Sequence, residues 1–207
     1  MFPMSRPRYG KRLFDLIVAL LLLIVLSPVY ALIALLVATD GGPMVFAHQR
    51  VGRNGKHFGC FKFRTMIVGA HECLDEYLAL HPKAADEWRR NQKLDSDPRI
   101  TGIGKLLRTT SLDELPQLMN VLRGDMGLVG PRPVTMNELE RRYSENANYY
   151  LSVRPGITGL WQVSGRNHLS YSQRVALDVR YVQTQSFLKD LMILGKTAKV
   201  LLTGDGK

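Results

Sequence analysis

Residues 108–116 include hydroxyl and carboxyl side chains of the types that can take part in a displacement at phosphorus. The stretch reads Arg-Thr-Thr-Ser-Leu-Asp-Glu-Leu-Pro, with Asp113 and Glu114 side by side. An ionised aspartate can attack phosphorus and hold the phosphoryl group covalently, which divides one difficult displacement into two easier ones. Ser111 and Glu114 also have the spacing of a capping box at a helix start, so both carboxylates could be only capping groups. The pattern leaves both interpretations open and predicts that both carboxylates lie in the first turn of a helix.

A carboxylate that attacks a phosphorylated substrate needs cationic groups around it, because its own charge repels the substrate. Mg²⁺ is one such group, and Asp113 would then also be a metal ligand. Arginine is another, since its planar fork matches two phosphate oxygens. Arg132 lies between two prolines, which restrict the loop and reduce the entropy cost of presenting its guanidinium. A proline turn with a solvated arginine is the simpler alternative.

Further basic residues could neutralise the same substrate. Lys62 and Arg64 alternate along a predicted strand and would share one face of it. That face could be a phosphate site or a basic rim directed at lipid. The candidate phosphate-binding residues are Lys62, Arg64, Arg108, Arg132, Arg154 and Arg166.

A glycine-rich loop towards the C-terminus could contact a nucleotide. Gly165 is followed by Arg166 and Asn167, and glycine there would let the backbone approach a phosphate or a base. A commonplace glycine turn is the alternative. Trp161 could stack on a base, although a buried tryptophan is the favoured interpretation.

The most conspicuous element that must position these groups is an apolar segment near the N-terminus. From Leu16 to Ala38 only Ser27 and Pro28 interrupt it. A straight helix of this length would reach about 35 Å, enough to cross the hydrocarbon core of a bilayer. Pro28 removes a backbone donor and kinks or breaks a helix, and Ser27 can satisfy a freed carbonyl. The centre of the segment is therefore predicted to be a break.

Both flanks of this segment are basic, and the positive-inside rule assigns both to the cytoplasm. A re-entrant hairpin satisfies that rule and is favoured over the alternative of a kinked spanning helix. Lys11, Arg12 and Asp15 have spacings that pair charges on a helix, and we expect them to pin the segment at the membrane interface. A carboxylate solvated among headgroups is the alternative for Asp15.

The predicted fold is mostly α with a small β-hairpin, an α+β class, in two parts: residues 1–40 as basic flank and membrane hairpin, and 41–207 as a cytoplasmic catalytic domain. An Asn-Gly turn joins two predicted strands, 44–46 and 58–63. Helices are predicted over residues 66–93 with a break at His81-Pro82, one or two over 103–123, and others over 136–150, 170–183 and 187–202. The last would lie on the membrane surface as an amphipathic helix or pack on the core. Residues 154–167 read as a loop.

The charge balance favours anionic partners. There are 28 basic and 18 acidic residues, a formal net charge of +10. Acidic lipid, phosphorylated substrates and nucleic acid would all suit that excess. The sequence shows no basic helix or aromatic-studded strand typical of nucleic-acid binding, so nucleic acid is not an expected partner.

Seven motifs, in one order along the chain, resemble those of the bacterial sugar transferase family, the monotopic phosphoglycosyl transferases that begin polysaccharide and glycoconjugate assembly. The resemblance covers nearly the whole chain, and seven motifs in order are far more specific than any one. They are Lys11-Arg12-x-x-Asp15, the apolar segment with Ser27-Pro28, and the stretches 61–66, 111–117, 124–126, 130–133 and 154–167.

The resemblance implies a reaction and its site. Asp113 would be the nucleophile on the β-phosphate of a UDP-sugar, UMP would leave, and undecaprenyl phosphate would take the sugar phosphate from the covalent intermediate. Mg²⁺ would assist, with Asp113 among its contacts, and Glu114 would orient the site or handle a proton. The positions that match the family's positively charged site residues are Lys62, Arg108, Arg132 and Arg166.

The resemblance also implies a place in the cell and a class of sugar. The chain would sit as a re-entrant hairpin in the bacterial inner membrane, among anionic phospholipids, with its catalytic domain on the cytoplasmic face; a homodimer is left open. Residues 159–162 look more like those of galactose or glucose phosphate transferases than of diamino-sugar enzymes. The chain resembles a small member or a fragment of a larger one. A non-catalytic membrane-anchored assembly scaffold is the alternative function, and a membrane-tethered nucleic-acid-binding protein a third.

Overall fold

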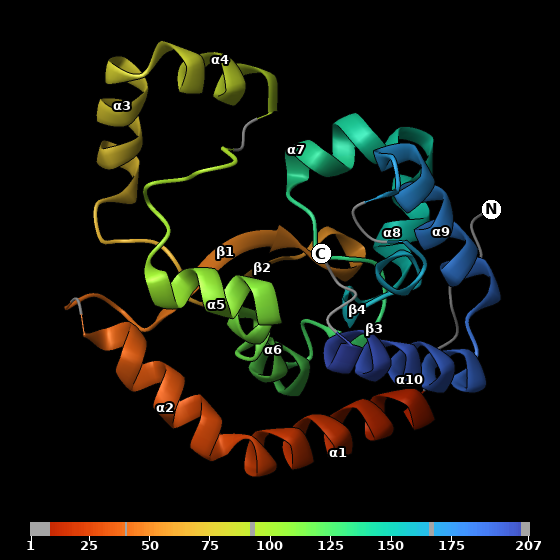
Figure 1. The fold of residues 1–207 in the computed structure, drawn as a ribbon. Helices are drawn as coiled ribbons and strands as arrows, with labels where there is room; N and C mark the ends of the chain where they lie inside the picture. The colour runs from red at the N-terminus through yellow and green to blue at the C-terminus, as the bar shows by residue number, and fades with distance from the viewer. Residues whose placement is uncertain (1–8, 40, 92–93, 166–167, 204–207) are drawn as a thin grey trace.

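The computed structural model describes residues 9–39, 41–91, 94–165 and 168–203. Within them the chain is mostly helical, with two small two-stranded sheets, in agreement with the predicted α+β class. The two N-terminal helices run along one edge of the molecule, and the last helix lies beside the first of them (Figure 1).

The predicted break in the apolar segment is confirmed. Helix α1 spans Tyr9–Val25, helix α2 spans Ser27–Ala38, and the two are bent by 64°. Pro28 lies in the first turn of α2, where its missing N–H has no intrahelical partner to lose. The Ser27 hydroxyl donates to the Ile24 carbonyl at 2.8 Å, so serine satisfies a backbone group at the bend.

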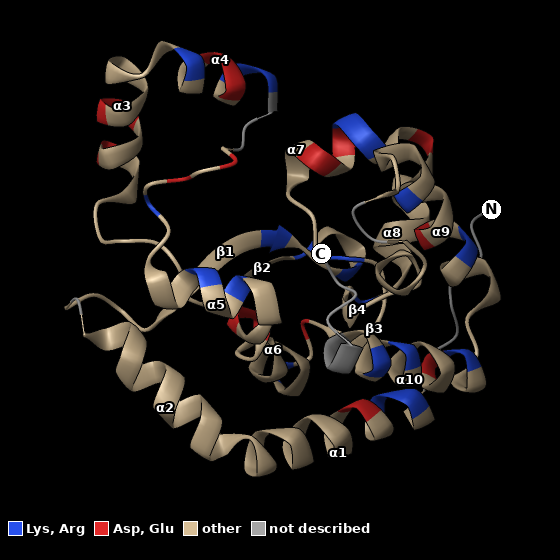
Figure 2. Cartoon of the chain, in the orientation of Figure 1, with Lys and Arg blue, Asp and Glu red and all other residues tan. Residues whose placement is uncertain are grey.

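The helix pair presents apolar side chains outward. Leu21, Ile24 and Leu35 are more than half exposed, and charged residues gather at the start of α1 (Figure 2). Among the described residues no helix taken singly has the length and apolar character to cross a bilayer, while the bent pair taken together does, as a broken span or a re-entrant loop.

The predicted β-hairpin is confirmed, with longer strands than expected. Strand β1 (Val45–Val51) pairs antiparallel with β2 (His57–Phe63) through the short turn η1 (Arg53–Gly55). Asn54 and Gly55 both have positive φ, 58° and 77°, in the left-handed region that Asn and Gly tolerate. The Asn-Gly pair therefore reverses the chain as predicted.

The helical stretch after the hairpin breaks where His81-Pro82 predicts. Helix α3 spans Ala70–Leu80 and α4 spans Pro82–Asn91, and together they form an arm at one edge of the molecule (Figure 1). The predicted helical region over 103–123 contains two helices, α5 (Gly102–Thr110) and α6 (Gln117–Arg123). A single turn of 3-10 helix, η2 (Leu112–Glu114), lies between them.

A second, parallel sheet was not predicted from the sequence. Strand β3 (Gly127–Val129) pairs with β4 (Gly156–Thr158). Strand β4 lies within the segment 154–167, which was predicted to be a loop. The backbones approach so closely that a Cβ on Gly156 would lie 2.1 Å from the Gly130 nitrogen. Glycine in both motifs is thus a packing requirement, because any side chain would separate the two segments.

The single helix predicted over residues 136–150 is wrong. The segment is divided into α7 (Met136–Glu138), a π-helical turn η3 (Leu139–Tyr143), a 3-10 turn η4 (Ser144–Asn146) and α8 (Ala147–Ser152). Ser144 has a positive φ of 43°, which no continuous helix contains. Buried Tyr143 and Tyr150 stack edge to face, and this packing overrides the local preference for one helix.

The two C-terminal helices are confirmed. A 3-10 turn, η5 (Trp161–Val163), precedes α9 (Tyr171–Thr184), which begins with a Ser170 capping box, and α10 (Phe187–Thr203) follows. Helix α10 has two faces: Ile193 is fully buried, whereas Leu188 is 77% exposed. The predicted packing on the core is therefore present on one face of the helix, while the predicted membrane-surface position of the other face stays a prediction. Ala19 of α1 belongs to the same core cluster as Ile193.

Candidate active site

Asp113 and Glu114 lie next to Lys62. The Lys62 ammonium is 2.7 Å from Glu114 Oε1 and 3.5 Å from Asp113 Oδ2. The carboxylates come from η2 and the lysine from β2, so the chain between them must fold back to form the group. Asp113 is largely buried, at 8% exposure. The fold thus brings these three charged side chains together.

The predicted capping box is wrong. Ser111 has φ 59° and closes the C-terminal end of α5, and its side chain caps neither helix. A left-handed residue here turns the chain sharply after Thr110, so Asp113 and Glu114 lie in a single 3-10 turn and not in the first turn of a longer helix. The interpretation of these carboxylates as capping groups depended on the capping box, so the structure does not support it.

Opposing influences act on the pKa of the Asp113 carboxyl, and burial is the largest of them. Burial raises the pKa of its carboxyl above the ordinary value, and the neighbouring Glu114 charge raises it further. Lys62 opposes both effects, through its charge and its hydrogen bond, and Arg108 adds a smaller lowering influence on the pKa. Lys62 is therefore the main group that keeps Asp113 available as a carboxylate.

Arg108 and Arg64 have different surroundings. Arg108, in the last turn of α5, donates from Nε to the Thr65 hydroxyl at 2.8 Å and acts on Asp113 electrostatically. Arg64 donates to the backbone carbonyls of Val37 at 2.9 Å and Pro43 at 2.8 Å. The shared face expected for Lys62 and Arg64 is thus split: the first contacts the carboxylates, and the second ties the end of α2 to the sheet.

Arg132 lines the same cleft as Lys62 and Glu114. Its side chain is exposed between two buried prolines, as expected for a guanidinium presented by a restricted loop. The Pro131 carbonyl accepts a hydrogen bond from the Gly156 N–H at 2.8 Å, which holds the loop on β4. The complete set of residues around the cleft is Arg50, Cys60, Lys62, Glu114, Gln117, Arg132, Pro133, Ile157 and Gln162.

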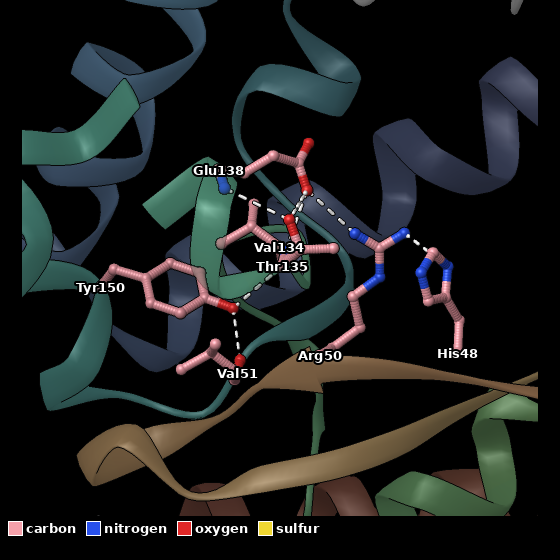
Figure 3. A network of polar contacts seen from close by, with 7 residues as sticks. All are labelled: His48, Arg50, Val51, Val134, Thr135, Glu138 and Tyr150. Carbon is pink, nitrogen blue, oxygen red and sulfur yellow. Dashed lines mark hydrogen bonds and ion pairs between the residues drawn. The ribbon is translucent and has the colours of Figure 1, made fainter. Parts of the chain in front are cut away.

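A polar network that was not predicted from the sequence fixes the loop after Arg132 (Figure 3). The buried Tyr150 hydroxyl donates to the Val51 carbonyl at 2.6 Å and accepts from the Val134 N–H at 3.2 Å. Across the same loop, Arg50 pairs with Glu138 at 3.0 Å.

Glu138 also forms a capping box with Thr135, so the side chain that binds Arg50 is itself held at the start of α7. The Thr-x-x-Glu spacing was a signal for this cap in the sequence. The pairing with Arg50 of β1 was not, because 88 residues separate the partners.

Asn120 is a second residue that the sequence did not reveal. It is fully buried on α6, accepts from the Phe61 N–H at 2.9 Å and donates to the Gly59 carbonyl at 2.8 Å. These bonds fix α6 against β2 one residue before Lys62. The helix that follows η2 and the strand that carries Lys62 are thereby held in register.

The candidate nucleotide-contacting residues are only partly described. Trp161 is buried, as favoured, and the Arg174 guanidinium covers its ring at 4.8 Å. Gly165 has φ 131°, and its carbonyl accepts a hydrogen bond from the His168 N–H at 3.0 Å. Arg166 and Asn167 lie outside the described residues.

The charges at the start of α1 face protein and not solvent. Asp15 is 3% exposed, so the alternative of a solvated carboxylate is wrong. Lys11 pairs with Asp15 at 3.6 Å, as its spacing predicts, and with Asp190 of α10 at 3.0 Å. Arg12 donates to the Val121 carbonyl at 2.7 Å and not to Asp15. These residues pin α1 to the rest of the fold.

Arg154 is not among the residues that line the cleft of Arg132. Its Nε donates to the Gly124 carbonyl at 2.7 Å, just past the end of α6. Of the candidate phosphate-binding residues, the cleft and its immediate surroundings thus bring together Lys62, Arg108 and Arg132.

The donor chemistry at η2 is compatible with magnesium. No group of three His, Cys, Asp or Glu side chains suited to a metal occurs in the part of the chain that the structure describes. Mg²⁺, however, is commonly held by one or two carboxylates together with substrate phosphates and water. Asp113 and Glu114 supply two adjacent carboxylates beside the cleft, so the residues present fit that mode of binding.

Comparison with known proteins gives a family match over almost the whole chain. The family described as bacterial sugar transferase matches residues 6–204. The chain is 52% identical over 199 residues to the undecaprenyl-phosphate galactose phosphotransferase of Salmonella typhimurium strain LT2, covering 96% of this chain and 42% of that protein.

Two further relatives differ in length. The exopolysaccharide production protein ExoY of Sinorhizobium fredii is 50% identical over 198 residues, 95% of this chain and 87% of that protein. The UDP-glucose:undecaprenyl-phosphate glucose-1-phosphate transferase of Caulobacter vibrioides is 40% identical, over 94% of this chain and 70% of that protein. The chain thus spans less than half of the Salmonella relative but most of the ExoY protein.

Proposed function

Because this chain belongs to the bacterial sugar transferase family, we propose that it transfers a sugar 1-phosphate from a UDP-sugar to undecaprenyl phosphate and releases UMP. The observation that carries the proposal is the Lys62–Asp113–Glu114 group beside the cleft of Arg132. The printed names of the relatives, which include galactose and glucose 1-phosphate transfer to undecaprenyl phosphate, support this substrate class. A scaffold would not need these charges in one site.

In the first half-reaction the Asp113 carboxylate attacks the β-phosphorus of the UDP-sugar. An Asp–O–P bond forms, the bond from that phosphorus to the bridging oxygen breaks, and UMP leaves with the electron pair. The Lys62 ammonium contacts this carboxylate at 3.5 Å, which keeps the pKa of Asp113 from rising as far as burial alone would take it.

In the second half-reaction a phosphate oxygen of undecaprenyl phosphate attacks the same phosphorus. The Asp–O–P bond breaks, the carboxylate of Asp113 is restored, and the sugar is left on a lipid diphosphate. Neither half-reaction requires a base if the attacking phosphate is ionised, so Glu114 serves to hold Lys62 in place, at 2.7 Å, beside the nucleophile.

The surrounding cations neutralise the phosphates. Arg132 lines the cleft from its restricted loop, and Arg108 acts on Asp113 from the end of α5. Guanidinium groups held in place before substrate arrives stabilise developing charge without reorganisation. We extend this phosphate-binding role to Arg166, which follows the left-handed Gly165.

Mg²⁺ is the proposed cofactor. Asp113 and Glu114 would hold it together with the donor's phosphates, and when bound it would draw charge from the phosphoryl oxygens. Lys62 forms ion pairs with the same two carboxylates. Its positive charge therefore neutralises part of their negative charge when no metal ion is bound.

The bent helix pair is proposed to be a re-entrant hairpin in the bacterial inner membrane, with the catalytic domain on its cytoplasmic face. Its support is the 64° bend at Leu26, the exposed apolar side chains on both arms and the basic residues on both flanks. The polyprenyl tail of the acceptor would stay in lipid while its phosphate reaches the headgroup level. Anionic phospholipids would then neighbour the basic flanks.

UMP release is the direct test of the reaction. The full chain, in detergent with undecaprenyl phosphate and Mg²⁺, is given UDP-galactose, UDP-glucose and UDP-N-acetylglucosamine in turn. We expect UMP from a hexose donor, and mass spectrometry of the quenched enzyme should find a hexose phosphate on the peptide that contains Asp113. If no donor yields UMP, the proposed function is wrong.

A further inference from the structure

A second basic cluster lies at the turn end of the β-hairpin. Side chains from the β1–β2 connection, from the end of α6 and from the segment before β4 surround a hollow there. We define the turn cluster as the three arginines Arg53, Arg123 and Arg154. The other residues around the hollow are Gly52, Asn54, Lys56, Phe58, Gly124 and Asp125.

The turn cluster is separate from the site at Asp113. Lys62 lies near one end of β2, and the hollow lies at the other end, where Phe58 is the strand residue that lines it. The rise along an antiparallel strand puts Lys62 and Phe58 about 14 Å apart. No residue around the hollow also lines the cleft of Arg132.

Two of the three guanidinium groups of the turn cluster, those of Arg123 and Arg154, are held in place by protein contacts. Arg154 is anchored through Nε to the Gly124 carbonyl at 2.7 Å, and Arg123 covers the Phe61 ring at 4.7 Å. Among the described residues no acceptor bonds the terminal nitrogens of Arg154. The anchored Nε therefore leaves the forked end of the guanidinium for an external anion.

Protein carboxylates balance the local charge only in part. Burial lowers the pKa of Arg154, the charges of Arg12 and Arg53 lower it further, and the charges of Asp15 and Asp125 oppose them with smaller effects. The Arg53 Nε is buried and has no hydrogen-bond partner among the described residues. Asp125 is the one carboxylate around the hollow, and it accepts a hydrogen bond from Asn120.

We propose that the turn cluster is a second anion site, which binds a phosphate group through the forked ends of Arg53 and Arg154. An anion would relieve the repulsion between guanidiniums and supply the acceptor that Arg53 lacks. The phosphate could belong to a lipid headgroup or to a soluble phosphate compound. The headgroup source rests on the proposed membrane placement of α1, since Arg12 of that helix adjoins the cluster.

Thermal unfolding of the full chain in neutral detergent micelles tests the site with two probes. One probe is inorganic phosphate, compared with chloride at equal ionic strength. The other is phosphatidylglycerol in the micelles, compared with phosphatidylcholine, in phosphate-free buffer. A ligand that binds only the folded state raises the unfolding temperature, so we expect at least one probe to stabilise the wild type. A response to phosphate alone identifies a soluble source, and one to phosphatidylglycerol a headgroup.

Arg53→Gln is the decisive variant, because the Arg53 side chain makes no hydrogen bond to the described residues and its loss should leave the fold intact. We expect its apparent Kd for the active probe to rise about tenfold, as for the loss of one charge-assisted contact. Arg154→Gln should weaken the response likewise. Arg141→Gln removes the same charge from an exposed position and is the matched control.

The proposal is overturned if neither probe stabilises the wild type, if Arg53→Gln responds normally, or if Arg141→Gln loses as much of the response. Lys62→Gln must keep the response; if it does not, the anion binds at the Asp113 site. UMP release measured on the same preparations separates the two proposals. Turnover without a probe response overturns the anion site alone, and a response without turnover overturns the transferase alone.

Discussion

Two lysines in this molecule each lie between two carboxylates. Lys62 contacts Asp113 and Glu114, and Lys11 contacts Asp15 and Asp190. In both cases one carboxylate is within 3.0 Å and the other at 3.5 Å or slightly more. The residue types and the distances therefore do not distinguish the two groups.

Their surroundings do distinguish them. The side chains of Asp15 and Asp190 are 5% and 2% exposed, and the Tyr181 hydroxyl, itself buried, donates to Asp190 at 2.7 Å. The side chains of Asp113 and Glu114 are 12% and 22% exposed beside a cleft that also holds Arg132. The same ionic group thus locks α1 to α10 where it is enclosed, and is partly exposed where it borders a cleft.

The largest expected effect is the loss of activity in Asp113→Asn. Removing the nucleophile should lower the rate of UMP release about a thousandfold or more. The unfolding temperature should fall little or even rise, because a neutral amide avoids the desolvation that raises the pKa of Asp113. Turnover assays and thermal unfolding measure the two quantities. A variant that loses activity only in proportion to its folded fraction would contradict the proposed role.

Lys11→Met should have the opposite profile. It leaves Asp15 and Asp190 buried without their cation, so we expect a loss of about 3–5 kcal/mol in the free energy of unfolding. Denaturant titration of the full chain in detergent measures this loss. UMP release per folded molecule should stay close to that of the wild type. If Lys11→Met is as stable as the wild type, the enclosed group does not lock the helices.

Lys62→Met tests how the open group works. Lys62 lowers the pKa of Asp113, so without it that pKa rises and the carboxylate is lost at a higher pH. Activity requires the ionised form, and therefore the acid limb of the kcat/KM profile should move to higher pH. The maximal rate should also fall about a hundredfold, as for the loss of one preorganised charge. An unmoved acid limb would exclude Lys62 as the group that tunes Asp113.

The smallest effect is expected for Tyr150→Phe, behind the Arg132 loop. Its hydroxyl donates a hydrogen bond to the Val51 carbonyl and accepts one from the Val134 N–H. The variant should therefore lose about 1–2 kcal/mol in the free energy of unfolding. The KM for the donor should rise several-fold because the loop is less constrained. Tyr149→Phe is the matched control, since the Tyr149 hydroxyl makes no hydrogen bond to the described residues. Equal effects in both variants would show that the network does not position Arg132.

Predictions from local patterns largely agree with the structure. Pro28 predicted the bend, Asn54-Gly55 the hairpin turn, and His81-Pro82 the break between α3 and α4. Each follows from the restricted or permissive dihedrals of one or two residues, which neighbours cannot override at low cost. The capping box at Ser111 failed because the same spacing also fits a left-handed residue that ends the preceding helix.

Contacts between residues far apart in the chain could not be predicted from the sequence. Asn120 joins α6 to β2, and Arg50 pairs with Glu138 across 88 residues. The β3–β4 pair consists of two three-residue strands whose partners lie 29 residues apart along the chain, and strands of that length carry no periodic signal. The helix predicted over 136–150 is divided because buried tyrosines dictate the path of the chain.

By itself, the sequence determined the broken apolar helix, the α+β class and the residue types of the candidate site: a carboxylate pair with basic partners, in motifs that mark the family. Those features depend on residue type and short spacing, which are local properties of the chain. Only the tertiary structure decided that Lys62 and not Arg64 contacts Asp113, and that Arg154 belongs to a separate cluster. Packing of distant segments assigns charged side chains to their partners, and no local pattern contains that information.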